Sequence, residues 1–185
     1  MADILEIPEV RRRISPLTVE EYHRLDEFNE RGRRAELIRG IVIEKISKSP
    51  LHRTISSLLY KLISARLPKG FSAWKEEPLT FKDTDSEPEP DISVVRGTDT
   101  DFVKAHPHTA ELVIEVAVSS PELDRENASL YAEAGVKEYW IVLGPAQQVE
   151  VYRRPKNGQY AEKKVLGLED VIECMSLPGV SIRVD

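Results

Sequence analysis

The hydrophobic and polar positions of this chain alternate in some segments and recur at helical spacing in others, which predicts both strands and helices. Thr18 and Glu21 have the spacing of a capping box, Ser49 and Pro50 suit the start of a helix, and Gly135 suits a helix end. The predicted helices cover residues 18–31, 50–67 and 119–134. The second of these carries an apolar stripe made of Ile55, Leu58, Leu59, Leu62 and Ile63.

Short apolar or alternating runs predict the strands. The predicted strands cover residues 36–38, 41–43, 71–76, 79–82, 92–95, 111–118, 138–143, 149–152 and 159–165, with one or two more in the tail. Turn residues at 39–40 and 156–158 predict two antiparallel hairpins, whereas the strand–helix–strand order across residues 111–143 predicts a parallel pair. The fold class is therefore α/β in the mixed (α+β) sense, with helices flanking a mixed sheet.

Composition points to one globular domain, because 185 residues are enough for a full core and few for two. We expect this domain to cover residues 18–185, after an N-terminal extension over residues 1–17. The single cysteine excludes an internal disulfide and fits a reducing compartment. No run approaches the ~20 apolar residues of a membrane span, so we expect a cytoplasmic protein without a membrane partner.

The net charge of −6 hides an asymmetry along the chain. Residues 1–82 hold 16 basic and 12 acidic side chains, and residues 83–185 hold 10 and 20. The basic residues cluster at Arg11–Arg13, at Arg31, Arg33 and Arg34, and at Lys45, Lys48 and Arg53. Such clusters suit a phosphate-facing surface, or equally a solvated surface of mixed charge.

Two carboxylates stand at the ends of hydrophobic strands. Glu115 lies inside an apolar run with no Lys or Arg within nine residues, and Asp91 precedes the run Ile92–Val95. Burying an ionised carboxylate costs several kcal/mol without a positive partner, so the pair suggests a site for a hard cation. Alternatively, Asp91 caps a turn and Glu115 pairs with a distant arginine. If the acids form a site, replacing either should leave the fold intact and relieve their repulsion.

Asn127 is predicted to point toward the sheet, because Leu123, Asn127, Leu130 and Ala134 share one helix face. A buried amide needs hydrogen-bond partners, which either the strand-end acids or a nearby backbone group could supply.

Five segments together resemble a known protein family. They are residues 36–40, 49–52, 90–91, 112–116 and 130–142, which read ELIRG, SPLH, PD, LVIEV and LYAEAGVKEYWIV. In this order they resemble the Uma-type restriction endonuclease-like family, a branch of the PD-(D/E)XK nuclease superfamily. The resemblance runs from about Thr18 to the C-terminus and is most specific between Tyr131 and Val142.

The resemblance implies a restriction endonuclease-like core that hydrolyses DNA with Mg²⁺ or Mn²⁺. It implies that Asp91, Glu115 and the backbone carbonyl of Val116 hold the metal, and that Glu36 is a further metal or water ligand. His52 also matches a family position, where it could contact phosphate or hold its loop. A homodimer would let such a small nuclease reach both DNA strands.

The chain departs from this family at the lysine that helps to activate water. The motif places it at Ala117 and the Uma-type branch at the position of Asn127, which carries no charge. Losing such a group typically costs roughly 10²-fold or more in rate. A catalytically inactive nucleic-acid-binding or regulatory relative is therefore the alternative function. A carboxylate-pair glycosidase or a serine hydrolase is disfavoured by the few aromatic residues and by the lack of a nucleophile elbow.

Overall fold

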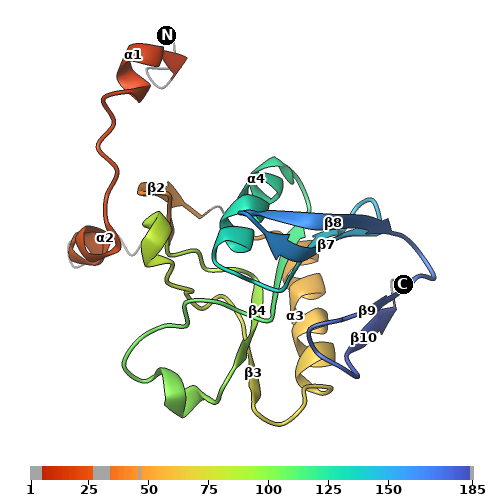
Figure 1. Cartoon of the computed structure of the whole chain (residues 1–185). Helices are drawn as coiled ribbons and strands as arrows, with labels where there is room; N and C mark the ends of the chain where they lie inside the picture. The colour runs from red at the N-terminus through yellow and green to blue at the C-terminus, as the bar shows by residue number, and fades with distance from the viewer. Residues whose placement is uncertain (1–5, 27–33, 46, 184–185) are drawn as a thin grey trace.

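A six-stranded mixed sheet forms the centre of this computed structural model, which describes residues 6–26, 34–45 and 47–183 (Figure 1). The strand order is β3-β4-β5-β6-β7-β8, with β5 and β6 parallel and the other neighbours antiparallel. The strands are β3 (Phe71–Trp74), β4 (Ile92–Arg96), β5 (Leu112–Ala117), β6 (Glu138–Leu143), β7 (Gln148–Lys156) and β8 (Gln159–Leu166). This arrangement confirms the predicted mixed sheet.

Two apolar clusters cover the two faces of the sheet. Helix α4 (Glu122–Glu133) makes the crossover between β5 and β6 and packs Leu130 and Tyr131 on one face with Val113. Helix α3 (Pro50–Ser64) packs Ile63 on the other face with Ile114. The hairpin of β9 (Val171–Glu173) and β10 (Ser181–Arg183) covers the same face as α3.

The predicted helix and hairpin signals have the expected geometry. In the capping box before α2 (Val19–Asp26), the Thr18 N–H donates to Glu21 and the Glu21 N–H donates to Thr18. The expected end of that helix near Arg31 lies outside the described residues. Strands β1 (Ala35–Ile38) and β2 (Ile41–Glu44) form the first hairpin, and Ser49 caps α3.

The strand predicted over residues 79–82 is wrong. Leu79 and Phe81 are buried as an alternating pattern requires, but their N–H groups bond to the carbonyls of Pro88 and Ser86 in a folded-back loop. Pro88 has no N–H to return, so a regular ladder cannot continue there. A short 3₁₀ helix, η2 (Lys82–Thr84), follows instead. A second one, η3 (Asp99–Phe102), follows β4.

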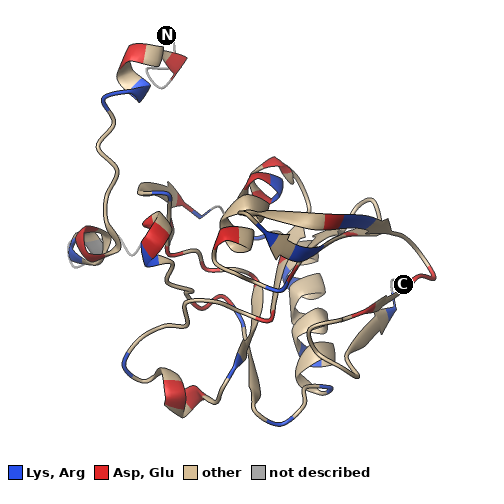
Figure 2. Cartoon of the chain, in the orientation of Figure 1, with Lys and Arg blue, Asp and Glu red and all other residues tan. Residues whose placement is uncertain are grey.

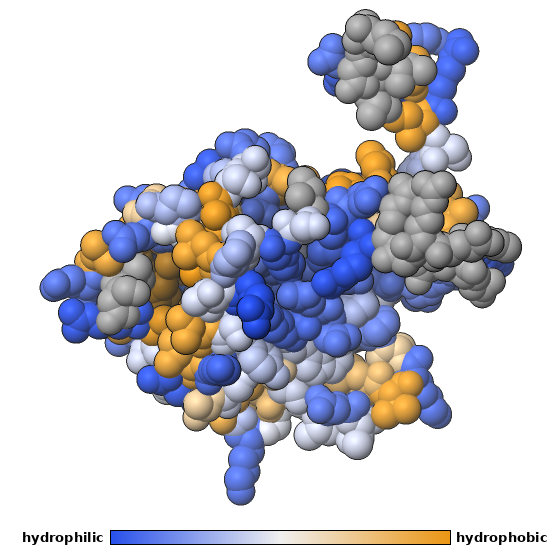
Figure 3. Space-filling model, turned by 180° about the vertical axis from the view of Figure 1, so that it is seen from behind, coloured by the Kyte–Doolittle hydropathy of each residue, from blue (hydrophilic) through white to orange (hydrophobic). Residues whose placement is uncertain are grey.

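Two apolar faces were assigned too broadly from the sequence. In α3, Leu58 and Leu62 are 56% and 40% exposed, because the β9–β10 hairpin takes part of the sheet face that the helix would cover. In α4, Leu123 is 43% exposed while Asn127 is buried, so the inward face is turned relative to the predicted one. Figure 3 shows the rear of the molecule, with a broad hydrophilic area at its centre and apolar patches to one side.

The N-terminal helix α1 (Pro8–Arg11) lies away from the sheet at the end of an extended stretch of chain (Figure 1). Lys and Arg positions are scattered among Asp and Glu positions over the fold rather than collected on one element (Figure 2). Arg31 and Arg33 of the second basic cluster lie outside the described residues. None of the helices in the described part of the chain has the length and apolar character that a membrane span requires.

Candidate active site

The register of β4 against β5 brings the two strand-end acids together. Ile92 lies opposite Ile114 in an antiparallel pair, so Asp91 comes opposite Glu115. The Asp91 N–H donates to Glu115 Oε2 at 3.1 Å, and the Val116 N–H donates to Asp91 Oδ2 at 2.8 Å. The backbone of each strand thus holds the carboxylate of the other.

Asp91 is buried and has two basic side chains from the start of α3 as neighbours. Lys48 Nζ lies 2.5 Å from Oδ1, and His52 Nε2 lies 2.9 Å from Oδ2. Ser49 fixes this turn by accepting a hydrogen bond from the His52 N–H. Burial raises the pKa of Asp91, but the hydrogen bond from His52 and the charge of Lys48 outweigh burial and hold that pKa below its ordinary value.

His52 was expected either to contact phosphate or to hold its loop. Its Nε2 is engaged with Asp91, and its Nδ1 is buried without a hydrogen-bond partner in the described chain. The imidazole therefore belongs to the carboxylate cluster, on the side where α3 begins.

Glu115 has no cation bound to it among the described residues. Its Oε1 accepts a hydrogen bond from the Tyr131 hydroxyl at 3.1 Å, and its Oε2 accepts the Asp91 N–H. Burial, and then the charges of Asp91, Asp124 and Glu36, raise its pKa well above the ordinary value, against a weaker effect of Lys45. Among the described residues, no arginine pairs with Glu115 as the alternative interpretation expected.

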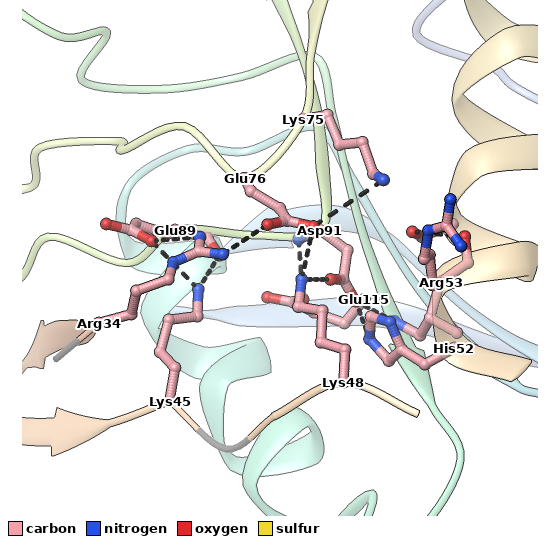
Figure 4. Close-up of polar contacts among 12 residues, drawn as sticks. Arg34, Lys45, Lys48, His52, Arg53, Lys75, Glu76, Glu89, Asp91 and Glu115 are labelled. Carbon is pink, nitrogen blue, oxygen red and sulfur yellow. Dashed lines mark hydrogen bonds and ion pairs between the residues drawn. The ribbon is translucent and has the colours of Figure 1, made fainter. Parts of the chain in front are cut away.

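Glu36 enters from the first hairpin and lies at the edge of the cluster. Its Oε2 accepts the Glu89 N–H at 3.2 Å and lies 3.7 Å from Lys45 Nζ. Lys45 also donates to the Glu89 carbonyl, and Arg34 pairs with the Glu89 carboxylate at 3.1 Å. Figure 4 shows these basic side chains from the first hairpin reaching toward acids that precede β4. Arg34, Lys45 and Lys48, which come from two of the basic clusters, therefore balance acids at this site.

Helix α4 presents three polar side chains at one face, at positions i, i+3 and i+7. Tyr131 reaches Glu115, and Asp124 interacts with the charges of Asp91 and Glu36. Asn127 lies between them and is 7% exposed, with no side-chain hydrogen bond to another described residue. The expected contacts of Asn127 with the acids or a backbone group are thus not made, and its amide is left for another ligand.

Asp124 is a residue of this site that the sequence analysis missed. Burial first, and then Asp91 and Glu36, raise its pKa to about 7, against the charges of His52 and Arg125. The sequence signal was helical spacing: Asp124 lies four residues before Ala128 and seven before Tyr131, so it shares their helix face. This face is recognised when the inward side of α4 is centred on Asn127 rather than Leu123.

The donor atoms of the site suit a small divalent cation. In a strand the N–H and C=O of one residue point to the same side, so the Val116 carbonyl faces the side on which its N–H meets Asp91. Asp91, Glu115 and this carbonyl supply hard oxygen atoms. Within residues 6–26, 34–45 and 47–183, no three acidic, His or Cys side chains converge on one metal position. A Mg²⁺-like ion would accordingly need water or substrate oxygens, as it commonly does.

A family comparison identifies the group to which this arrangement belongs. The model of the Uma2 family, described as "Putative restriction endonuclease", matches residues 19–185. This chain belongs to the Uma2 family. The match includes every candidate site residue discussed above.

A solved structure has the same fold as this Uma2 protein. It is described as a "putative nuclease belonging to DUF820" from Anabaena variabilis. The two chains share 22% sequence identity with a TM-score of 0.76, over 91% of this chain and 96% of the other. At this identity the likeness shows the fold. No curated protein matches the chain.

Proposed function

We propose that this chain is a metal-dependent endonuclease that hydrolyses DNA phosphodiester bonds. The observation that carries the proposal is the β4–β5 register, in which Asp91 lies opposite Glu115 and beside the Val116 backbone. These three groups would hold Mg²⁺ or Mn²⁺, with Glu36 as a ligand of the ion or of its water. Membership of the Uma2 family supports the same function. A bound divalent cation would polarise the scissile phosphate and lower the pKa of a water.

The side chains around the carboxylates have separate tasks in this reaction. A water oxygen attacks phosphorus, one P–O ester bond breaks, and the products are a phosphomonoester and a hydroxyl. Asp124, a carboxylate that interacts with the charges of Asp91 and Glu36, can take the proton that the attacking water loses. Asn127, which is buried and makes no side-chain hydrogen bond to a described residue, offers an amide that can orient the water. We also propose a homodimer, in which two such sites would address the two DNA strands.

The alternative is a nucleic-acid-binding relative of the same fold that has lost turnover. The observation in its favour is that neither Ala117 nor Asn127 carries the ammonium group of the family motif. An Asn127→Lys variant separates the two functions. If the wild-type protein does not cleave DNA and this variant does, the natural site binds nucleic acid but has lost its catalytic activity.

Nicking of supercoiled plasmid by the purified chain in Mn²⁺ tests the proposal. We expect nicked and linear DNA in Mn²⁺, none in EDTA, and at least a 10²-fold slower rate for Asp91→Asn and Glu115→Gln. Glu122→Gln is the matched control, because it removes an exposed acid from the first turn of the same helix that carries Asp124. Cleavage that persists at full rate in Asp91→Asn would come from a contaminant or another site and would overturn the proposal.

A further inference from the structure

We propose that Lys48 supplies the positive charge that Ala117 and Asn127 lack. Its ammonium holds Asp91 in the metal-free protein and contacts a nucleic-acid phosphate once a divalent cation has taken that carboxylate. The inference rests on the proposed function and assigns a positioning residue outside the strand and helix that carry the family motif.

The start of α3 fixes Lys48 beside the carboxylates. Lys48 precedes the N-cap Ser49, and Pro50 occupies the first turn of the helix. From this point Lys48 Nζ lies 2.5 Å from Asp91 Oδ1 and 3.0 Å from Glu76 Oε1, and its side chain is 23% exposed (Figure 4). The ammonium group thus bridges a proposed metal ligand and a second acid at the open edge of the site.

Glu76 provides an anchor for Lys48 that does not depend on Asp91. The Glu76 N–H donates to the Pro90 carbonyl at 3.1 Å, and its second carboxylate oxygen pairs with Arg34 at 2.7 Å. Its backbone is left-handed, with φ of 59°, which is uncommon for a residue other than glycine and is maintained by these contacts. If Asp91 exchanges its ammonium partner for a metal ion, Glu76 still keeps Lys48 at the site.

Exchange of partners at Asp91 follows from simple electrostatics. A divalent cation and an ammonium group on the same carboxylate repel each other, so binding of the cation favours displacement of Lys48 Nζ. The flexible four-carbon stem of lysine allows this movement while the backbone stays in place. A nucleic-acid phosphate bound to the cation would bring negative charge close to Lys48. The displaced ammonium group could then donate hydrogen bonds to this phosphate.

Arg125 and Lys45 are less suited to this task. Arg125 is engaged with Glu150 at 2.7 Å on a different part of α4. Lys45 donates to the Glu89 carbonyl and supports Glu36 rather than Asp91. Lys48 is the lysine that contacts Asp91 directly within the described residues.

Two measurements on the whole chain test the proposal without requiring turnover. The first is Mn²⁺ affinity by calorimetry without DNA, and the second is the salt dependence of binding to a labelled duplex in Ca²⁺. For Lys48→Met we expect roughly tenfold tighter Mn²⁺ binding, because a competing charge is removed. We also expect the slope of log Kobs against log[salt] to become shallower by about one phosphate contact. Lys48→Arg should restore the wild-type slope.

Lys75→Met is the matched control, because Lys75 Nζ lies 3.9 Å from Glu76 but forms no ion pair with Asp91. It should leave both the Mn²⁺ affinity and the salt slope close to the wild-type values. Unchanged or weaker Mn²⁺ binding by Lys48→Met would overturn the exchange at Asp91. An unchanged salt slope would overturn the phosphate contact. If the wild-type chain binds DNA in this way but never cuts it, the nuclease proposal fails while the assignment of Lys48 stands.

Discussion

The Asp91 N–H donates to Glu115 Oε2 at 3.1 Å, yet the two neighbouring carboxylates have opposite shifts in pKa. Burial raises the pKa of Asp91, but the hydrogen bond from His52 and the charge of Lys48 hold that pKa below its ordinary value. Glu115 receives only neutral donors, and burial raises its pKa. Without metal, the ionised form is therefore favoured at Asp91 and disfavoured at Glu115. Removing one or the other acid should have different effects on stability.

Glu115→Gln should stabilise the metal-free protein at alkaline pH. A carboxyl group whose pKa is raised by folding contributes stability below its unfolded pKa of about 4.3 and loses that contribution as pH rises toward the folded pKa. At pH 8 the substitution should therefore raise the free energy of unfolding, by about 1 to 2 kcal/mol. Urea unfolding in EDTA at pH 5 and pH 8 measures the difference. A loss of stability at both values would show that Glu115 is a structural acid.

Asp91→Ala should destabilise the protein, which reverses the expectation from sequence that either acid could be removed without loss. The substitution leaves Lys48, His52 and the Val116 N–H without their shared acceptor. Loss of a largely buried acceptor of this kind costs roughly 2 to 3 kcal/mol. Urea unfolding at pH 7 in EDTA should show this loss, and Glu122→Ala at an exposed position should change the midpoint little. Wild-type stability of Asp91→Ala would contradict the contacts described here.

Asp124→Asn should flatten the dependence of stability on pH. The pKa of Asp124 is about 7 in the folded protein, against about 3.9 when unfolded, so its contribution to stability falls as pH rises between these values. The variant should melt at a higher temperature than wild type at pH 8 in EDTA and at a similar temperature at pH 4. Melting temperatures measured at intervals of one pH unit would reveal the change. If the melting temperatures of the two proteins vary with pH in the same way, the pKa of Asp124 is not raised by folding.

Local patterns predicted much of the fold because the physical causes lie within a few residues. The capping box at Thr18, the turn at Gly40 and the cap at Ser49 each depend on short-range hydrogen bonds or backbone freedom. Burial of Asp91 and Glu115 was predictable in the same way, since each adjoins an apolar strand. Their contact depends on the register of β4 against β5, which the structure gives, whereas the sequence suggested only that the two acids share a cation site.

The residues that surround these acids could not be found from local patterns. Whether Asp124 faces the site depends on the rotation of α4 about its axis. An error of one residue in the predicted helical phase is enough to place it on the wrong side. Lys48 lies in a connecting segment without periodicity, and it meets Asp91 and Glu76 only through tertiary structure. The sequence therefore pointed to Asp91, Glu115 and Glu36, whereas Asp124 and the pairing of Lys48 with Asp91 required the structure.

Gly40→Ala should destabilise the hairpin that carries Glu36. Gly40 has φ of +75°, and an added Cβ would lie 2.3 Å from Pro16 Cβ and 3.0 Å from the backbone of Leu17. The substitution would also strain the bond from the Leu17 N–H to the Gly40 carbonyl, which is 2.9 Å long. We expect a loss of more than about 2 kcal/mol in urea unfolding, from left-handed strain and steric overlap together.

Gly179→Ala separates these two causes. Gly179 has a similar φ of +88°, but an added Cβ would meet no atom within 4 Å. Gly179→Ala should therefore lower the free energy of unfolding only by the cost of the left-handed backbone, about 1 kcal/mol. If Gly40→Ala loses no more than Gly179→Ala, Pro16 moves aside freely, and the chain before α2 does not brace the hairpin. A clearly larger loss would show that this segment is packed against the turn and supports the strand from which Glu36 reaches the acids.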